Sequence, residues 1–539
     1  MTLGVLLWAC PARAAETLAN EDCLSCHTEV DEKAFAASAH GSENCVSCHS
    51  DVKSLEHPEE LAPVDCASCH ESEAMAIAGS VHGKVQAGGG VSVSCKDCHG
   101  SHEVLSPASP ASRMHRFNVA KTCSSCHEDI GAQYLRSVHG KAMLAGKFEA
   151  PVCTDCHGEH GIRSHLDPKS RVHATQLSEK VCAQCHAAER ITSKFGMSAD
   201  RIRTYFDSYH GLAGRAGSAS VANCASCHGA HDILPSSDPA SSVHKTNLVK
   251  TCGECHPGAS ERLTEGTIHL APSPDKDRKI YYLTVFYIAF IVLVVGSMLA
   301  HNLLDLRRKV KEHYEQRHAQ SHHARFNTNE RVQHLVLAVT FSLLAYSGFA
   351  LKFPDAWWAW PIVGLDPTHE WRGRIHRWAA LLFTALCVYH VGYILLTPRG
   401  RGQLRSMLPR VRDARDLVQM VRHNLGHPVR RPRLARYTYV EKLEYWALAW
   451  GTVIMVVTGT VLVFENISLR YLPKWLIDAA TVVHYYEAIL ATLAILIWHL
   501  YFTVFDPEHY PMNWSMKHGR THEERTDEEP PPPDKSPRA

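Results

Sequence analysis

The chain has 539 residues, and its 56 Lys and Arg nearly balance its 55 Asp and Glu, which leaves a formal net charge of +1. A balance this close to zero excludes nucleic acid and acidic ligands as partners selected by overall charge. The length predicts several domains. Cysteine and histidine are unusually frequent, with 20 and 38 residues, and most of both lie before residue 270.

The first 15 residues have the features of an export signal. Leu3 to Ala9 is apolar, and Ala12-Arg13-Ala14 follows it in the form of a small-residue cleavage site. We therefore expect residues 1–15 to be a signal peptide, so that the segment that follows is exported across the bacterial inner membrane.

Nine copies of Cys-x-x-Cys-His lie between Cys23 and His256. This is the attachment signature of haem c, because two thiols can bond to the two vinyl groups of one porphyrin while the adjacent histidine binds its iron. A single copy could be a zinc knuckle or a redox dithiol, but nine copies that all end in His predict nine covalent haems c. The attachment cysteines are Cys23, Cys26, Cys45, Cys48, Cys66, Cys69, Cys95, Cys98, Cys123, Cys126, Cys153, Cys156, Cys182, Cys185, Cys224, Cys227, Cys252 and Cys255, and the proximal histidines are His27, His49, His70, His99, His127, His157, His186, His228 and His256.

One further histidine can be chosen from each gap between motifs and after the last one. Four lie in Ser-x-His-Gly, one lies in Thr-Ile-His-Leu, and four precede a motif by eight or nine residues. We expect these to be the distal ligands of six-coordinate haems: His40, His57, His82, His115, His139, His173, His210, His244 and His269. An alternative stays open, because His102, His160 and His231 each lie three residues after a proximal histidine, in Cys-His-Gly-x-His.

The haem region, residues 16–272, contains an internal repeat. His82, His139 and His210 recur in the same Ser-x-His-Gly context at spacings of 57 and 71 residues, which indicates duplication of a two-haem unit. About 250 residues around so many porphyrins cannot build an ordinary core. We therefore expect short helices and loops that pack against haem in the periplasm.

Five apolar segments follow, at about 281–300, 332–351, 375–396, 443–464 and 479–505. About 20 apolar residues in a helix cross a hydrocarbon core of about 30 Å, so we expect a mainly α fold with a five-span bundle. We divide this part into a linker and first span (273–303), a basic cytoplasmic loop (304–331), a four-helix dihaem cytochrome b domain (332–506) and a disordered cytoplasmic tail (507–539). Arginines between Thr397 and Tyr437 agree with that orientation.

Histidines within spans are candidate ligands, because ionisable groups are rare in hydrocarbon. His376 and His390 are 14 residues apart on one span, or about 21 Å along a helix, and His484 and His499 form a similar pair. This spacing predicts two haems b, one near each membrane surface. We assign His376 and His484 to the outer haem, and His499 with either His334 or His390 to the inner haem. We expect five others to be solvated: His301, His313, His318, His322 and His323.

Residues 330–515 resemble the dihaem cytochrome b subunit of membrane-bound formate dehydrogenases and hydrogenases. The resemblance rests on Arg331-Val332-Gln333-His334, Ser347-Gly348, His376, Tyr445-Trp446, Thr458-Gly459, His484 and His499. In that family the first and last spans share the inner haem, which implies His334 rather than His390. The fusion of such a domain to a nine-haem region is similar to the CbcL-type inner-membrane multihaem cytochromes of metal-respiring bacteria.

The same resemblance suggests a quinone site at the turn before the third span of this domain. The family has an Asn-containing turn there, and Thr438 stands at that position in this chain. We take Tyr439, Glu441 and Lys442 as the candidate catalytic residues, with Glu441 or a neighbouring group as the acceptor of a quinol proton.

The leading hypothesis is a quinol dehydrogenase of the bacterial inner membrane. Quinol, expected to be menaquinol, would pass electrons through two haems b and nine haems c to a periplasmic cytochrome, with the lipid bilayer and the quinone pool as further partners and no nucleic acid. Two alternatives stay open: a quinone reductase fed by periplasmic donors, and a multihaem reductase of a small substrate. The second needs an open iron position, which the abundant histidines disfavour. The paired membrane histidines also disfavour a passive anchored wire.

Overall fold

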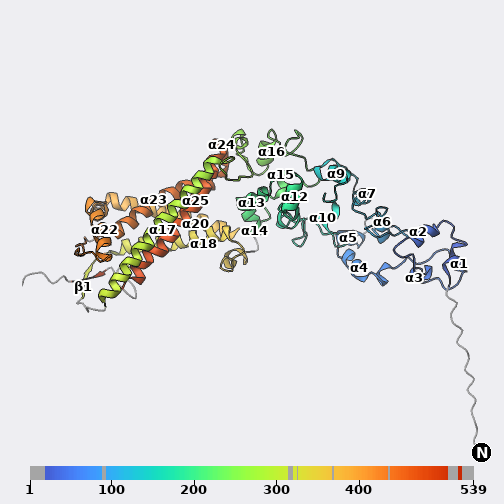
Figure 1. Ribbon diagram of the computed structural model, residues 1–539, viewed down its shortest axis with the longest axis horizontal. Coiled ribbons are helices and arrows are strands. Elements are labelled where there is room, and N and C mark those ends of the chain that lie inside the picture. The colour runs from blue at the N-terminus through green and yellow to red at the C-terminus, as the bar shows by residue number, and fades with distance from the viewer. Residues whose placement is uncertain are drawn as a thin grey trace, which may run out of the picture. The chain divides into compact units, whose positions relative to one another are not determined.

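The computed structural model describes residues 18–87, 93–313, 320–324, 326–366, 370–434, 437–507 and 520–524. Helices dominate these residues (Figure 1), which confirms the mainly α fold. The expected signal peptide and most of the expected tail lie outside the described residues. The chain divides into two compact units: the first comprises residues 1–199 and 222–247, and the second comprises residues 200–221 and 248–539.

This division differs from the boundary expected near residue 272. Residues 200–221 and 248–272 carry the ninth Cys-x-x-Cys-His motif, and they group with the membrane helices rather than with the other motifs. The domain bounds given above remain predictions.

The first unit consists of short helices joined by loops, and many of its helices begin or end at a cysteine motif. Helices this short are not stable alone. A small apolar cluster of Val119, Ala120, Tyr134, Met143 and Val152 packs α7, α8 and α9 together. The helices are α1 (Asn20–Leu24), α2 (Glu32–Ala36), α3 (Cys45–Cys48), η1 (Cys66–Ser68), α4 (Glu71–Ala78), α5 (Val81–Ala87), α6 (Cys95–His99), α7 (Val119–Ser124), α8 (Glu128–Arg136), α9 (Val138–Leu144), α10 (Cys153–His157), η2 (Ser178–Cys182), α11 (Ala183–His186), α12 (Glu189–Lys194) and α15 (Cys224–His228).

One backbone hydrogen bond recurs between successive repeats of the first unit. In each repeat, the N–H of the residue before the Ser-x-His-Gly histidine donates to a carbonyl two residues beyond a Cys-His-Gly-x-His motif. The three bonds are Ala39 to Val104 (2.7 Å), Val81 to Ile162 (2.8 Å) and Val138 to Ile233 (2.8 Å). The repeats are therefore interleaved, and each contributes to the structure of the next.

The second unit contains five helices long and apolar enough to cross a membrane, which confirms the predicted number of spans. They are α17 (Arg278–His313), α18 (Thr328–Lys352), α20 (Trp371–Leu396), α23 (Tyr439–Val463) and α25 (Lys474–Ala494), which continues through the π-helical turns η4 (Ile495–His499) and η5 (Tyr501–Phe505). Further elements are α13 (Asp200–Asp207), α14 (Tyr209–Arg215), α16 (Leu248–Gly253), η3 (Glu261–Glu265), α19 (Trp360–Val363), α21 (Pro398–Met407), α22 (Val411–Asn424), α24 (Glu465–Tyr471) and the antiparallel strands β1 (Gln320–Ala324) and β2 (Arg520–Glu524).

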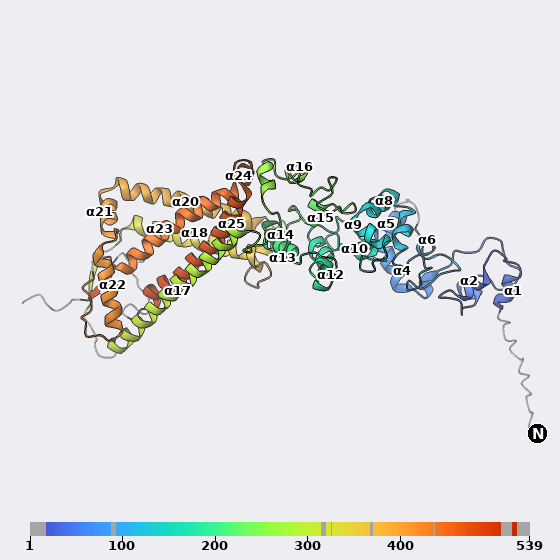
Figure 2. The same ribbon diagram turned by 45° about the horizontal axis from the view of Figure 1, so that its top comes forward.

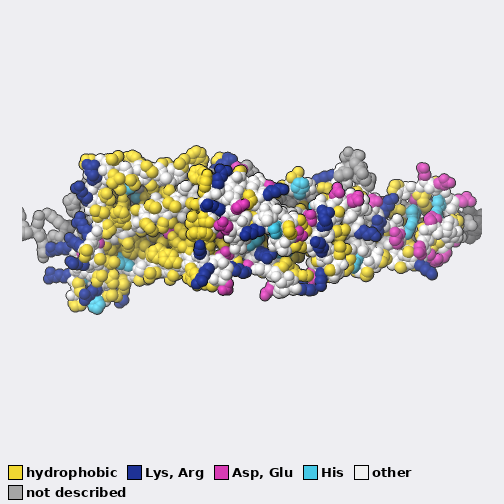
Figure 3. Space-filling view, turned by 90° about the horizontal axis from the view of Figure 1, so that it is seen from above, with side chains coloured by type: hydrophobic (Ala, Val, Ile, Leu, Met, Phe, Trp, Pro, Cys, Tyr) yellow, Lys and Arg dark blue, Asp and Glu magenta, His cyan; other side chains and the backbone are white. Residues whose placement is uncertain are grey.

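The long helices pack in neighbouring pairs, α18 with α20, α23 with α25, and α17 with α25. Figure 2 shows α21 and α22 at one end of these helices, which we call the basic end, and α24 at the other, which we call the far end. Between the two ends the surface is apolar (Figure 3), and Val292, Leu293 and Val388 are 67%, 69% and 69% exposed. An apolar surface of this extent on membrane-length helices is suited to contact with lipid.

The structure corrects the expectation for His301. Its side chain is buried, and its Nε2 lies 2.9 Å from the Tyr439 hydroxyl. The reason is that α17 continues as one helix beyond the apolar segment, so its last turns pack against neighbouring helices instead of entering solvent. His318 lies outside the described residues, and the side chains of His313, His322 and His323 are not described.

The same turns of α17 carry a buried ion cluster. Lys309 Nζ lies 3.0 Å from Asp305 Oδ2 and 2.8 Å from Asp506 Oδ2, and Asp305 also accepts a hydrogen bond from the Tyr501 hydroxyl. Asp305 and Asp506 are almost fully buried. The cluster fixes the end of α17 against the end of the last span.

We expect Lys309→Met to destabilise the second unit, because it leaves two buried carboxylates without their shared cation. Removal of one partner from a buried ion pair costs about 3–5 kcal/mol. Thermal unfolding of the purified protein in detergent measures the effect, and the exposed Lys311→Met is the matched control on the same helix. Equal unfolding temperatures for the two variants would contradict the prediction.

Candidate cofactor-binding histidine pairs

Most proximal histidines face a second histidine at a nearly constant distance. In the first unit the ring centroids lie 5.9–6.3 Å apart in His27–His57, His40–His70, His49–His102, His82–His127, His99–His160, His139–His186 and His157–His231, and in the second unit they lie 6.0 Å apart in His210–His256. A metal–imidazole bond is about 2.0 Å and a ring centroid lies roughly 1 Å behind its nitrogen, so two imidazoles on one ion have centroids about 6 Å apart. The spacing therefore fits two axial ligands of one haem iron.

The Ser-x-His-Gly motif has a structural reason for each of its residues. Ser137 is the N-cap of α9: its hydroxyl donates to the Tyr134 carbonyl at 2.6 Å and accepts from the Gly140 N–H at 3.1 Å. A Cβ on Gly140 would lie 2.1 Å from the Tyr134 carbonyl oxygen, so only glycine fits. The motif begins α9 in close contact with the preceding helix, α8, and so positions His139. Burial lowers the pKa of His139 to about 4, which keeps its imidazole neutral.

Glycine has a different role in Cys-His-Gly-x-His. Gly100, Gly158 and Gly229 end their helices with φ of 86°, 83° and 78°, a region that other residues rarely adopt. The chain turns sharply there, and the histidine two residues later faces the proximal histidine of another motif. His102, His160 and His231 reach His49, His99 and His157 in this way.

The structure does not pair His115, His173 or His244 with a proximal histidine. Each instead closes a turn that follows a buried serine. The Nδ1 atoms of His173 and His244 lie 2.8 and 2.7 Å from threonine hydroxyls two residues later, and the His115 ring packs against Phe117. Their regular recurrence therefore reflects a repeated local turn. The two remaining histidines, His228 and His269, each interact with other residues of the chain.

The cysteine motifs associate in consecutive pairs. Burial and the neighbouring Cys23 raise the pKa of the Cys45 thiol, and burial and Cys95 raise that of Cys66. Hydrogen bonds to Cys153 and Cys224 raise the pKa of Cys123 and of Cys182. The first cysteines of motifs one and two, three and four, five and six, and seven and eight are therefore neighbours, which agrees with duplication of a two-motif unit.

Two histidine pairs lie within the membrane helices. His376 and His484 have ring centroids 6.5 Å apart near the far end, and His334 and His499 have centroids 6.1 Å apart near the basic end. Both separations fit two ligands of one iron. The far-end pair joins α20 to α25, and the basic-end pair joins α18 to η4.

Hydroxyl groups fix the tautomer of the far-end pair. Ser347 donates to the Leu343 carbonyl, so its oxygen accepts from Nδ1–H of His376 at 2.8 Å. Thr458 donates to the Ile454 carbonyl and accepts from Nδ1–H of His484 at 2.9 Å. Nε2 of each ring is then left with a lone pair for a metal. The next residues are Gly348 and Gly459, where a Cβ would lie 3.5 and 3.3 Å from the rings.

The basic-end pair has a charged partner instead. Nδ1 of His499 is hydrogen-bonded to the carboxylate of Glu444 on α23. His499 lies in the π-helical turn η4. Such turns are rare in proteins as a whole, but those that occur are often found at functional sites. Sequence reasoning missed Glu444, because a glutamate near the end of a span carries no motif of its own.

His390 does not face another histidine, and its ring packs against Tyr445. Its Nδ1 lies 2.7 Å from the Gln333 amide oxygen and its Nε2 lies 3.1 Å from the Tyr445 hydroxyl. Both ring nitrogens have partners, so His390 has no lone pair available in this arrangement.

The three residues of the predicted catalytic turn make different contacts. Glu441 accepts from the Thr438 N–H at 2.6 Å in a capping box, and the buried Lys442 lies 2.8 Å from Asp413 of α22. Tyr439 contacts His301, whose ring centroid lies 5.0 Å from that of Trp498, the neighbour of His499. Nδ1 of His301 and Nε1 of Trp498 are buried without a hydrogen-bond partner.

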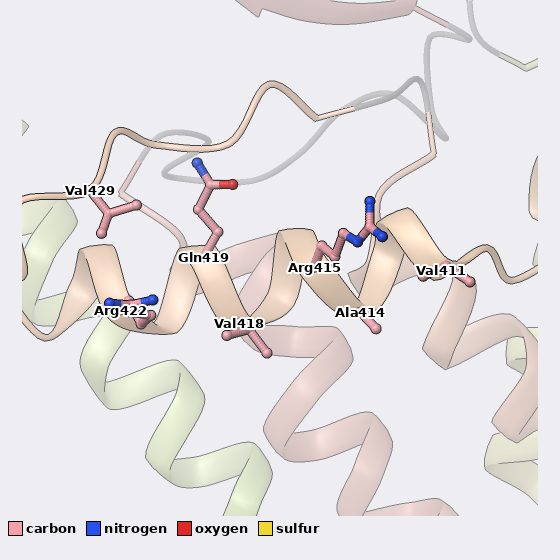
Figure 4. Close-up of a pocket in the computed structure, with 7 residues that line it drawn as sticks. All are labelled: Val411, Ala414, Arg415, Val418, Gln419, Arg422 and Val429. Atoms are coloured by element: carbon pink, nitrogen blue, oxygen red, sulfur yellow. The ribbon is translucent and has the colours of Figure 1, made fainter.

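A shallow hollow of about 450 Å³ lies on α22. It is lined by Val411, Ala414, Arg415, Val418, Gln419, Arg422 and Val429. Val411, Ala414 and Val418 project from one side of the helix, and Gln419 projects from the other (Figure 4). None of the paired histidines lines this hollow, so it is separate from the candidate ligand sites.

Comparison with known proteins identifies the membrane part. Residues 267–410 and 325–514 match the family described as prokaryotic cytochrome b561. No curated protein matches the chain. The matched region contains all five spans and both membrane histidine pairs. The second unit is therefore similar to a multi-pass b-type cytochrome of the prokaryotic b561 family, which indicates electron transfer through haem b in a membrane.

Proposed function

We propose that the protein oxidises quinol, taken to be menaquinol, at the basic end of the bundle and delivers electrons to nine haems c and a periplasmic acceptor cytochrome. The observation that carries the proposal is the presence of two histidine pairs at opposite ends of one five-helix bundle, with a haem-motif region on the same chain. When bound at these pairs, haem supplies one-electron carriers that connect the two membrane surfaces.

The ligands of the haems c are proposed from the ring pairs. His40, His57, His82, His102, His139, His160, His210 and His231 are the distal ligands of eight motifs. His269 remains the ninth distal ligand, as expected from the sequence, because no further Cys-His-Gly-x-His follows His231. The set expected from the sequence is thereby revised at three positions, where His102, His160 and His231 replace His115, His173 and His244.

The partners of the membrane pairs support an outward direction of electron flow. A carboxylate bonded to Nδ1 of a ligand gives the imidazole more negative charge, which favours ferric iron, whereas a neutral hydroxyl does so less. Glu444 therefore lowers the potential of the basic-end site relative to the far-end site, where Ser347 and Thr458 are the partners. Electrons released at the basic end move toward the higher potential.

Tyr439 and His301 are the proposed proton acceptors for quinol. A quinol hydroxyl can give its proton to the Tyr439 oxygen while Tyr439 gives its own proton to Nε2 of His301, 2.9 Å away. His301 packs against Trp498, next to the ligand His499, so the proton leaves quinol near the site that takes the electron. Asp305, one turn further along α17, can stabilise the resulting imidazolium.

The distal ligands can be tested by comparison of His102→Met with His115→Met. Replacement of an axial imidazole by a thioether raises the potential of that haem. We expect His102→Met to move one haem c to higher potential in a redox titration followed by absorbance, while His115→Met leaves the titration curve unchanged. The reverse result would restore the assignment based on spacing.

We expect Glu444→Gln to raise the midpoint potential of the basic-end haem b. Loss of the carboxylate removes stabilisation of the ferric form, and a shift of roughly 59 mV corresponds to a tenfold change for one electron. Potentiometric titration of the haem b bands measures the shift. The exposed Glu370→Gln, which removes a carboxylate at the far end, serves as the control. A fall or no change in potential would refute the direction argument.

The proposed function is tested by quinol-driven reduction in Tyr439→Phe. Loss of the hydroxyl should slow reduction of haem b by a menaquinol analogue about tenfold or more, at the lower end of general acid–base effects, and leave reduction by dithionite unchanged. Tyr389→Phe removes a hydroxyl from Asn329 near the same end and is the matched control. If quinol does not reduce haem b in the unmodified protein, the quinol dehydrogenase proposal is wrong.

A further inference from the structure

We infer that the ninth motif, with His256 and His210 as its histidine pair, is the c-type site that exchanges electrons directly with the far-end membrane pair, His376 and His484. The inference rests on the proposed function and specifies the route out of the membrane. One electron leaves the far-end site, which is oxidised, and reduces the ninth site, with no proton transferred.

The ninth motif differs from the other eight in its surroundings. The first cysteines of the others are neighbours in consecutive pairs, as described above. The ninth motif instead belongs to the second compact unit, together with α14 and the five membrane helices. Among the described residues, it is the motif whose structural context is the membrane bundle.

The segment around His210 is anchored to the far end of the bundle. Asp207, three residues before His210, lies 2.8 Å from Nζ of Lys352 at the end of α18, and Arg215 at the end of α14 forms an ion pair with Asp355. Nζ of Lys352 also lies 5.7 Å from the ring of Tyr485, the residue after the ligand His484. His210 and His484 are thus linked through a short series of contacts that runs over Asp207, Lys352 and Tyr485.

The segment after His256 is also anchored to the far end, through α24. The Ser260 hydroxyl donates to the Leu469 carbonyl at 2.8 Å, and Arg262 donates to the Tyr471 carbonyl at 2.6 Å. Both acceptors lie in α24, at the far end (Figures 1 and 2). The segment around His210 and the segment after His256 are therefore both held against the bundle.

The far-end membrane pair lies close to these contacts. Ser347, which binds His376, precedes Lys352 by five residues, or about 7.5 Å along α18. Arg372, one turn before His376 on α20, donates to the Ser347 carbonyl at 3.3 Å. Lys352, which holds the segment before His210, thus lies on the same helix as Ser347, the hydrogen-bond partner of His376.

The repeat pattern explains why the bundle occupies this position. In three earlier repeats, the Ser-x-His-Gly motif is bonded to the Cys-His-Gly-x-His segment of the next repeat. The repeat of His210 contains its own Cys-His-Gly-x-His, which ends at His231, but no further copy follows in the sequence, and α14 instead contacts α18. The membrane bundle therefore takes the place of a next repeat, and next repeats carry the neighbouring haem sites.

Gly258 provides a test that leaves every ligand intact. A Cβ at this position would lie 1.8 Å from the Asn466 carbonyl oxygen, so Gly258→Ala must push the loop after His256 away from α24. A Cβ at Gly253 would have no such neighbour within 4 Å, and alanine occupies that position in the motifs that begin at Cys66, Cys182 and Cys224. Gly253→Ala is therefore the matched control.

Rapid mixing with a menaquinol analogue, with separate observation of the haem b and haem c bands, distinguishes the outcomes. We expect Gly258→Ala to keep its haem content, its reduction of haem b by quinol and its full reduction by dithionite, but to lose rapid reduction of haem c. Gly253→Ala should behave as the unmodified protein does. Rapid reduction of haem c in Gly258→Ala would overturn the inference, whereas failure of quinol to reduce haem b in every variant would overturn the proposed function instead.

Removal of single haems gives an independent measurement. The variant Cys252→Ser with Cys255→Ser should accept electrons from quinol into haem b but pass none to the remaining haems c. The variant Cys23→Ser with Cys26→Ser also lacks one haem c, and in it quinol should still reduce all the others. Reduction of the remaining haems c to the same extent in both variants would show that electrons leave the membrane by a different site.

Discussion

Two imidazoles that bind one iron must have ring centroids about 6 Å apart, and the histidine pairs of this structure share that spacing. Ten ring pairs have centroids between 5.9 and 6.5 Å apart, although their residues come from short helices, sharp turns and membrane spans. In the first unit the constraint is met by interleaved repeats, in which one repeat supplies the proximal and another the distal histidine. In the bundle it is met by helix packing.

The two membrane pairs satisfy the same constraint with different partners. Hydroxyl groups hold the rings at the far end, and a carboxylate holds His499 at the basic end. These partners differ in charge and not in the ring spacing that they support. Bound iron would therefore be ferric more readily beside the carboxylate than beside the hydroxyl groups. A bundle with two similar histidine pairs can therefore have a built-in direction.

Much of the organisation could be predicted from the sequence, because it depends on local signals. The cysteine motifs and the length of each apolar segment require no knowledge of tertiary structure, and the spans were predicted correctly in number. The distal histidines were harder. Spacing favours His115, His173 and His244, whereas the structure brings His102, His160 and His231 to proximal histidines, through the positive φ of the glycine in Cys-His-Gly-x-His.

Other features depended on contacts that no local pattern encodes. Glu444 becomes important only because α23 packs beside η4, and His301 is buried only because α17 continues past its apolar segment. Glu441 illustrates the opposite case. Its position makes it a candidate for proton transfer, and its carboxylate also caps α23, a role that the sequence Thr-x-x-Glu predicts from local pattern alone.

The interleaving of repeats also has a consequence for how the protein is made. The histidine that faces His49 lies beyond two later motifs, at His102. By contrast, His40 precedes its partner His70, and His82 precedes His127. In a chain exported from its N-terminus, as the proposed function requires, attachment of a porphyrin and binding of a second histidine would be separate events for some motifs and nearly simultaneous for others. The arrangement of the histidines would then set the order of maturation.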